Sequence, residues 1–434
     1  MRGSLAAASL RGTGARRLPY TRESGEGQER VEDDRADWKR QLLGIAAAAA
    51  GRARDAARAI ERAIDRDPVH VVGYRGYASA ERALVLGRVI QDEGIGPAEP
   101  GHSRWRNLVD ALRRIESDPH PFAVVRARIG AADREIVADD EGFLREWIRL
   151  EQPLGEAGWA DVSLELQHHE ATRQVRTIAP ILSPPADAAF GVISDMDDTV
   201  LQSRVTNFLR AARLLLLENA RTRLPFPGVA AFYRALVAGP SGGARNPIFY
   251  VSSSPWNIYD VIADFLEAQD IPAGPLLLRD WDLLAVRDRH ASHKSRHIAE
   301  ILETFPALRF VLVGDSGQED PEIYSAIVRA HPERILAIYI RDVTKNPARI
   351  EAIGRLAEDV RTAGTPLVLA DDTLSAAKHA AEHGWIASDT LGDIGDEKRA
   401  DEGTSGARVE TPGVEAEHAP TIVVEHGRVE EQPD

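Results

Sequence analysis

The amino-acid sequence predicts an antiparallel β-sandwich domain followed by an α/β domain built on a parallel sheet. Between Val69 and about Leu182, short apolar runs alternate with turn residues, which is typical of an antiparallel sandwich. After the linker Ser183-Pro184-Pro185, strand-like runs alternate with helical segments, which indicates βα units and a parallel sheet. A chain of 434 residues also exceeds one typical hydrophobic core, so we expect two folded domains with tails.

The composition narrows the classes of function. The chain carries 68 acidic and 53 basic side chains, and its net charge of −15 disfavours binding to nucleic acid or to an anionic membrane. It has no cysteine, which excludes thiol nucleophiles and thiolate zinc sites. No run reaches the roughly 18 apolar residues of a membrane span, and arginines interrupt the N-terminal segment before a signal peptide could form. We therefore expect a cytoplasmic protein.

The N-terminal region divides into two segments. Residues 1–33 are rich in Gly, Arg, Ser and Glu and are predicted to be disordered. Residues 34–67 form an Ala-rich run with spaced Leu and Ile, which predicts one or two helices. This Arg-dense segment has two interpretations, a helix packed on its own protein or a helix lying on a membrane surface.

Residues 68–182 are assigned to the β-sandwich. Alternating polar and apolar side chains at 145–150 indicate a half-buried strand, and the acidic turn 139–142 precedes it. That turn is either solvated or a Ca²⁺ site, and a helix is expected at 107–115. The expected strands are 70–74, 83–90, 122–129, 134–138, 143–150, 160–166 and 174–181.

The α/β domain, residues 186–387, is organised around its first strand. The apolar run 188–194 is too short for a helix and stops at carboxylates, so it predicts a buried strand. Ligands of open α/β sheets bind outside the carboxyl ends of parallel strands, which places Asp195 and Asp197 at a binding crevice. Residues i and i+2 of an extended segment share a face, so the two carboxylates can converge.

The acidic cluster Asp195, Asp197 and Asp198 is the first candidate functional site. Carboxylates this close in sequence repel one another unless a cation or a proton neutralises them. Oxygen ligands without Cys or a nearby His favour a hard cation such as Mg²⁺ over zinc or copper. The alternative is a solvated acidic turn in which Asp198 or Thr199 caps a helix.

The segment after this strand is expected to cover the site. Crowded Leu and Phe side chains at 205–218 predict a helix that is apolar over much of its circumference, and a second helix ends near Val237. A helix inserted directly after the acidic strand is well placed to act as a small lid. Ordinary core packing and contact with a lipid are the other interpretations.

Two further polar segments follow. Strand 247–251 ends in Ser252 and Ser253, and hydroxyls with exposed N–H groups before a helix form an anion site that suits phosphate. A helix N-cap is an equally good interpretation. Lys294 precedes a helix expected at 295–305, and a single Lys in such a position is commonly a surface residue.

A second apolar strand ends in an acid. Gly314 and Asp315 follow it, and Gly314 and Gly317 would let the backbone approach a ligand closely. If the two acidic strands are neighbours, Asp315 lies beside Asp195 and Asp197 and completes a cation site.

The remaining elements complete the domain. Strands are expected at 276–278, 335–340 and 365–369, and a helix at 373–383. From residue 388 onward Glu, Asp, Gly and Pro dominate, so 388–434 is predicted to be a disordered acidic tail in which 422–424 alone has strand character.

The strand-end signals, in this order, resemble those of the haloacid-dehalogenase-like phosphohydrolases. More narrowly, they look like the catalytic domain of the actin-patch-associated phosphatidate phosphatases, over roughly residues 190–343. The sandwich also occurs in that family's bacterial members. The resemblance implies a Rossmann-like parallel sheet with a minimal helical cap. The segments that carry it are ISDMDDT at 193–199, YVSSSPW at 250–256 and VGDSGQED at 313–320.

The resemblance also implies catalytic roles. Asp195 is the nucleophile and Asp197 the general acid and base, which agrees with the ability of a carboxylate to attack phosphorus. Lys294 neutralises charge, and Ser252 and Ser253 bind the phosphate, where stabilising the transferring oxygens is the dominant task.

A metal site is implied in the same way. Mg²⁺ is held by the side chain of Asp195, the backbone carbonyl of Asp197 and the side chain of Asp315. Asp320 supports Asp315 from behind, and Thr199 belongs to the substrate-binding set.

The sequence thus predicts a Mg²⁺-dependent phosphomonoester hydrolase with an aspartyl-phosphate intermediate. Phosphatidate is the substrate that the resemblance implies, with a peripheral contact at the membrane. Two alternatives stay open, a phosphatase for a soluble phosphomonoester and a catalytically silent protein that binds partners through its sandwich. No nucleic-acid partner is expected.

Overall fold

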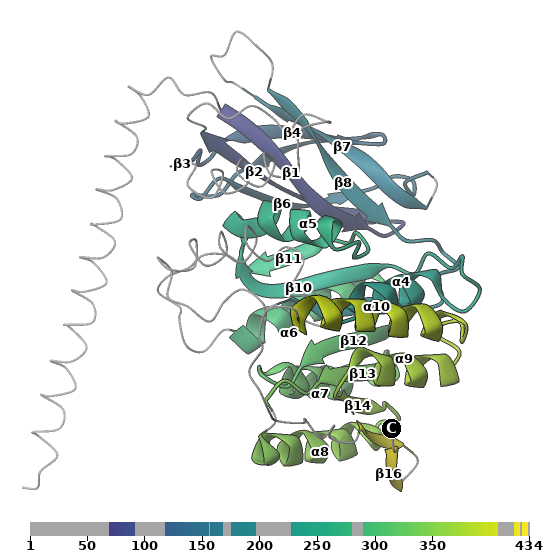
Figure 1. Ribbon diagram of the computed structural model, residues 1–434. Coiled ribbons are helices and arrows are strands. Elements are labelled where there is room, and N and C mark those ends of the chain that lie inside the picture. The colour runs from purple at the N-terminus through teal and green to yellow at the C-terminus, as the bar shows by residue number, and fades with distance from the viewer. Residues whose placement is uncertain are drawn as a thin grey trace, which may run out of the picture. The chain divides into compact units, whose positions relative to one another are not determined.

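The fold is given by a computed structural model. Its described residues belong to one compact unit, Asp67–Asp434. Within that unit the chain forms two sheets, sheet A before residue 184 and sheet B after residue 190, and helices accompany sheet B (Figure 1). The described residues are 69–91, 118–155, 157–167, 175–196, 227–279, 290–344, 346–406, 421–425 and 428–432.

Several predictions fall outside these ranges and stay predictions. They are the disordered segment 1–33, the helices of 34–67, the helix at 107–115, the lid helix at 205–218, and the residues Asp197, Asp198 and Thr199.

Sheet A contains all seven strands predicted before residue 184, and one further strand in the described part. The strands are β1 (Val69–Ala78), β2 (Arg82–Gln91), β3 (Asp118–Pro119), β4 (Val124–Ile129), β5 (Ala132–Val137), β6 (Phe143–Arg149), β7 (Gly158–Leu166) and β8 (Arg176–Ser183). The order is β3-β2-β1-β8-β7-β4-β5, with β6 paired to β2, and all pairs are antiparallel except β1 with β8.

The strands of sheet A form one curved, barrel-like sheet, whereas the sequence predicted a sandwich of two sheets. Strand β2 pairs with β1 on one edge and with β6 on the other. Strand β5, at the far end of the order, leads directly into β6 through the turn 139–142, so the sheet curves back on itself. A barrel and a sandwich share the same inward and outward alternation, so the pattern could not separate them.

Sheet B confirms the predicted parallel sheet. Its strands are β9 (Gly191–Asp195), β10 (Ile248–Pro255), β11 (Leu276–Arg279), β12 (Phe310–Asp315), β13 (Ile335–Arg341), β14 (Leu367–Ala370), β15 (Thr421–Glu425) and β16 (Arg428–Gln432). The order is β11-β10-β9-β12-β13-β14-β15-β16, and the pairs from β11 to β14 are parallel. The chain builds outward from β9 on one side, then returns to its other side at β12. Ligands bind at such a reversal of strand order.

Two groups of helices accompany sheet B. The helices are α4 (Val229–Ala238), the 3-10 helix η2 (Trp256–Ile258), α5 (Tyr259–Ala268), α6 (His290–Thr304), α7 (Asp320–Ala330), α8 (Pro347–Arg361), α9 (Thr373–Glu382) and α10 (Thr390–Gly406). Helices α6, α7 and α8 contact one another in succession, and α4, α9 and α10 form the second group (Figure 1). None of the described helices is long and apolar enough to cross a bilayer.

The prediction of a disordered tail from residue 388 is wrong for α10. Ile394 on this helix is fully buried. Glu397 and Asp401 accept hydrogen bonds of 2.8 Å from the backbone N–H groups of Ala231 and Gly228 at the start of α4. Carboxylates stabilise the unpaired N–H groups of a helix N-terminus, so acidic residues that suggested disorder have a folded role. Residues 422–424 lie in β15, as their strand character indicated.

Candidate active site

Strands β9 and β12 bring two acids together. Val313 pairs with Ser194, so Asp195 and Asp315 leave the sheet side by side. The carboxylates of Asp195, Asp315 and Asp320 each offer an oxygen within 4.8 Å of the others. The structure thus brings together Asp195 and Asp315 as predicted, and it adds Asp320 directly to the cluster.

Lys294 lies among these carboxylates. Its Nζ is 2.6 Å from Asp195 Oδ1, 2.9 Å from Asp320 Oδ1 and 3.4 Å from Gln318 Oε1. The side chain is 4% exposed, so the interpretation of Lys294 as a surface residue is wrong. Helix α6 begins at His290, five residues before the predicted start at 295, and places Lys294 inside the helix.

The turn after β12 holds Asp315 and Asp320 in place. Asp315 Oδ1 accepts hydrogen bonds from the backbone N–H groups of Gly317 (2.7 Å) and Gln318 (3.2 Å). Asp320 Oδ2 accepts one of 3.2 Å from the N–H of Asp315. A Cβ atom on Gly314 would lie 2.6 Å from Asp320 Oδ2. Glycine at this position is therefore needed for the close approach of Asp320.

The electrostatics of the cluster favour a cation. Burial raises the pKa of Asp320 above its ordinary value, although the neighbouring Lys294 acts in the opposite direction. One lysine faces three carboxylates, and a further positive charge would offset the remaining repulsion. The donors are hard carboxylate oxygens, which fit a divalent cation such as Mg²⁺.

The serines near the end of β10 lie next to Asp195. Val251 pairs with Asp195 across β10 and β9, so Ser252 follows at the same edge of the sheet. Ser252 is fully buried, and its Oγ accepts a hydrogen bond of 3.0 Å from the N–H of Ser254. The residues before η2 and α5 are Pro255 and Ile258, and neither makes a side-chain cap. The N-cap interpretation of the serines is therefore not supported.

One contact to the backbone of Asp195 had no signal in the sequence. Ser194 Oγ donates to the carbonyl of Asp195 (3.0 Å) and lies 2.7 Å from the hydroxyl of Tyr233 on α4. Burial raises the pKa of Tyr233, which keeps this hydroxyl neutral. Ser194 and Tyr233 meet because α4 packs on sheet B, so no local sequence pattern could reveal their contact.

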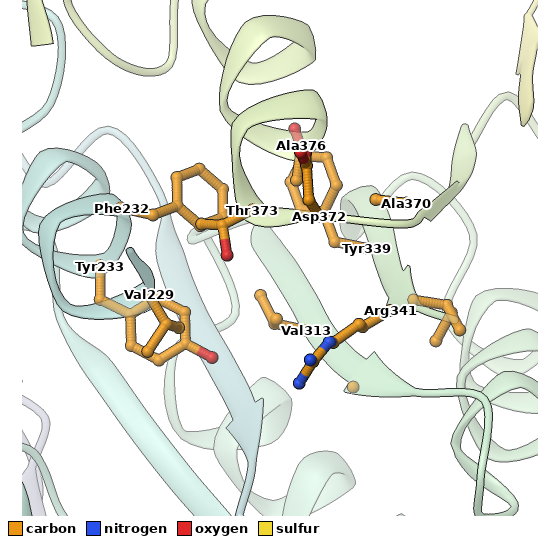
Figure 2. A pocket seen from close by; sticks show the side chains of 12 residues that line it. Val229, Phe232, Tyr233, Val313, Tyr339, Arg341, Ala370, Asp372, Thr373 and Ala376 are labelled. Atoms are coloured by element: carbon orange, nitrogen blue, oxygen red, sulfur yellow. The ribbon is translucent and has the colours of Figure 1, made fainter. Parts of the chain in front are cut away.

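A small cavity lies on the α4 side of β12. Its volume is about 20 Å³, and its lining includes Val229, Phe232, Val313 and Ala376. Figure 2 shows Tyr233 and Arg341 among the side chains around it. A cavity of this size holds about one water molecule, and the three clustered carboxylates do not line it. It is therefore too small to accept a substrate.

Comparison with known proteins relates one segment of the chain to a described family. Residues 190–342 match the family described as "Phosphatidate phosphatase APP1, catalytic domain". The Saccharomyces cerevisiae protein named "Phosphatidate phosphatase APP1" is 34% identical over 155 residues, which cover 35% of this chain and 25% of the yeast protein. This segment of the chain is therefore similar to the APP1 catalytic domain.

The matched segment, residues 190–342, contains the whole acidic cluster, Lys294 and the serines. An uncharacterised Schizosaccharomyces pombe protein is 28% identical over 155 residues, 35% of this chain and 25% of its own length. The chain thus matches about a quarter of each of these two relatives. A solved β-glucuronidase from Bifidobacterium dentium aligns at 11% identity over 77% of this chain and 58% of its own, with a TM-score of 0.21.

Two histidines accompany Lys294 on α6. The rings of His293 and His297 meet edge to face at 4.3 Å, and both are buried. Burial, with the nearby His297 and Arg296, lowers the pKa of His293 to about 3. Burial lowers the pKa of His297 as well. Both imidazoles are thus neutral in the folded protein near pH 7.

We expect the free energy of unfolding to fall as the pH drops from 6.5 toward 3. The folded-state pKa of His293 lies below its ordinary value of 6.5, so the unfolded chain binds the extra proton in this window. One such proton contributes at most about 1.4 kcal/mol per pH unit. His293→Gln should flatten this pH dependence of the free energy of unfolding, measured by urea unfolding at pH 7 and pH 4.5. An unchanged slope for His293→Gln would contradict the assignment.

Proposed function

We propose that this chain is a Mg²⁺-dependent phosphomonoesterase that hydrolyses phosphatidate or a closely related lipid phosphate. The observation that carries the proposal is Lys294 held between Asp195 and Asp320 at the edge where β9 and β12 end. The similarity of the surrounding segment to the APP1 catalytic domain supports the substrate class. The reversal of strand order at β9 is compatible with a Rossmann-like, haloacid-dehalogenase-type domain.

The proposed reaction has two displacements. A carboxylate oxygen of Asp195 attacks the phosphorus, the bond to the lipid alcohol breaks, and Asp197 gives a proton to the leaving oxygen. Asp197 then takes a proton from water, which attacks the aspartyl-phosphate, releases inorganic phosphate and restores Asp195. Splitting the hydrolysis in this way replaces one difficult step by two easier ones.

The chain's own groups stabilise the charge on the transferring oxygens. Lys294 places its ammonium beside Asp195 Oδ1, where the new bond would form. Val251 pairs with Asp195, so Ser252 lies at the same edge of the sheet as Asp195. Its hydroxyl would donate a hydrogen bond to a phosphoryl oxygen there. A bound Mg²⁺ would supply further charge stabilisation there.

The metal would be held mainly by Asp195 and Asp315, with the carbonyl of Asp197 as a third ligand. Asp315 is oriented by the N–H groups of Gly317 and Gln318. Asp320 already accepts from Lys294 and from the N–H of Asp315, so its role is to orient both of them.

Phosphate release from a panel of substrates tests the proposal. We expect full-length protein with Mg²⁺ to hydrolyse short-chain phosphatidate in detergent, and phosphatidate in phosphatidylcholine vesicles, faster than soluble phosphomonoesters. EDTA should abolish release and added Mg²⁺ should restore it.

Other outcomes would change the assignment. Release from soluble esters alone would retain the chemistry and reject the lipid substrate. Release in detergent but not from vesicles would reject a peripheral contact at the membrane. No release from any substrate would favour a binding protein.

A further inference from the structure

Sheet A contacts both elements that carry the proposed phosphate-binding groups. We propose that sheet A is a working part of the active site, in which Tyr74 on β1 positions the irregular end of β10 that carries Ser252. The inference rests on the proposed function, because it concerns how that site binds phosphate. It assigns a role to a domain whose function the sequence left open.

Tyr74 forms an aromatic stack with the start of η2 and α5. Its ring lies 5.5 Å from that of Trp256, nearly parallel at 12°, and 4.1 Å from that of Tyr259. Trp256 and Tyr259 also stack on each other at 6.0 Å. The hydroxyl of Tyr259 accepts a hydrogen bond of 2.7 Å from the N–H of Arg75, the next residue of β1. Aromatic pairs are stabilised by the burial of apolar area and also prefer particular relative orientations of their rings. The stack therefore fixes the position of Trp256 relative to β1.

The segment 252–254, the irregular part of β10 that contains the serines, is held at both ends. At one end Val251 is hydrogen-bonded into sheet B beside Asp195. At the other end Trp256 is fixed by Tyr74. Between them the register of β10 against β11 shifts from Val251 to Pro255, so Ser252 and Ser253 leave the regular ladder. A segment without regular ladder hydrogen bonds depends on the residues at its two ends for its geometry. Sheet A holds one of these ends, through the contact of Tyr74 with Trp256.

Helix α6, which carries Lys294, is held by sheet A as well. Arg145 and Trp147 on β6 donate to the carboxylate of Glu300, from Arg145 at 2.6 and 2.8 Å and from Trp147 Nε1 at 2.9 Å. Arg82 on β2 donates to Thr304 Oγ1 at 2.9 Å. Burial alone would raise the pKa of Glu300, but hydrogen bonds from His297, Arg145 and Trp147 hold it at about 2. The carboxylate of Glu300 therefore stays ionised at neutral pH, and its contact with Arg145 is an ion pair.

Loss of the Tyr74 ring should weaken the binding of phosphate more than it slows the chemistry. Ser252 would contact phosphate oxygens in the ground state and in the transition state alike, and loss of such uniform binding raises KM. A shift of about 1 Å in a group that positions the substrate can lower the rate of an enzyme by up to about a hundredfold. We expect Tyr74→Leu to raise KM, and the inhibition constant for inorganic phosphate, about tenfold, with kcat changed less than about threefold.

A matched pair of variants separates positioning from general stability. Tyr77→Leu removes a second, fully buried ring from the same strand, which contacts Trp147 and Phe249 but has no described ring contact with Trp256. Both Leu variants should lower the thermal unfolding midpoint, and only Tyr74→Leu should raise KM. Tyr74→Phe keeps the ring and should retain the wild-type KM. Trp256→Phe changes the other ring of the stack and should also raise KM, which provides a second test if Tyr74→Leu fails to fold.

The possible results are distinct. A raised KM for Tyr74→Leu or Trp256→Phe, with normal values for Tyr74→Phe and Tyr77→Leu, supports the inference. Equal KM values for the wild type and every folded variant overturn it while leaving the proposed function in place. Wild-type protein that releases no phosphate contradicts the proposed function, and the inference with it.

Discussion

Asp195→Asn should lower phosphate release by about 10⁴-fold or more, which is the scale of losing a nucleophile. The amide is nearly the same size as the carboxylate, but it does not attack phosphorus, so no aspartyl-phosphate forms. The fold should persist, because Lys294 keeps its contact of 2.9 Å with Asp320 and remains a paired buried charge.

Single-turnover phosphate release with Mg²⁺ measures the effect, and circular dichroism with thermal unfolding reports the fold. Asp161→Asn on the exposed face of β7 serves as the matched control and should keep wild-type turnover. Substantial turnover by Asp195→Asn would remove Asp195 from the role of nucleophile. It would then leave water activated by another group as the attacking species.

The strands and the edge that carries the site could be predicted because each depends on local sequence. An apolar run that ends in an acid, as at Asp195 and at Asp315, predicts a buried strand and also marks its carboxyl end. One geometric rule, that neighbouring parallel strands end at the same edge, was then enough to bring these two carboxylates together.

Other features depend on packing between distant segments. The contact of Lys294 with Asp320 requires the turn after β12 to fold back on α6, and no spacing in the sequence encodes that approach. The stack of Tyr74 on Trp256 joins a strand of sheet A to the start of η2, 182 residues later in the chain. For α10, the composition misled the prediction, because its acids are used to cap α4 and only Ile394 and its neighbours carry the apolar face.

Lys294→Met should strongly reduce both stability and activity. Removing one partner of a buried ionic group leaves the other charges uncompensated, at a cost of about 3–5 kcal/mol. Here the uncompensated groups are Asp195 and Asp320, whose side chains are 3% and 0% exposed. Lost stabilisation of the phosphoryl oxygens should lower kcat by about 10²- to 10³-fold, by analogy with removal of a single oxyanion donor.

The double variant Lys294→Met with Asp320→Asn separates these two effects. Neutralising Asp320 removes one of the buried charges that the methionine leaves unpaired, so urea unfolding should show part of the lost stability regained. Activity should not return, because the ammonium beside Asp195 is still missing. Lys378→Met on the exposed side of α9 is the control and should change stability by less than about 0.5 kcal/mol. If the double variant is no more stable than Lys294→Met, repulsion among the carboxylates is not what Lys294 relieves, and its role is confined to the substrate.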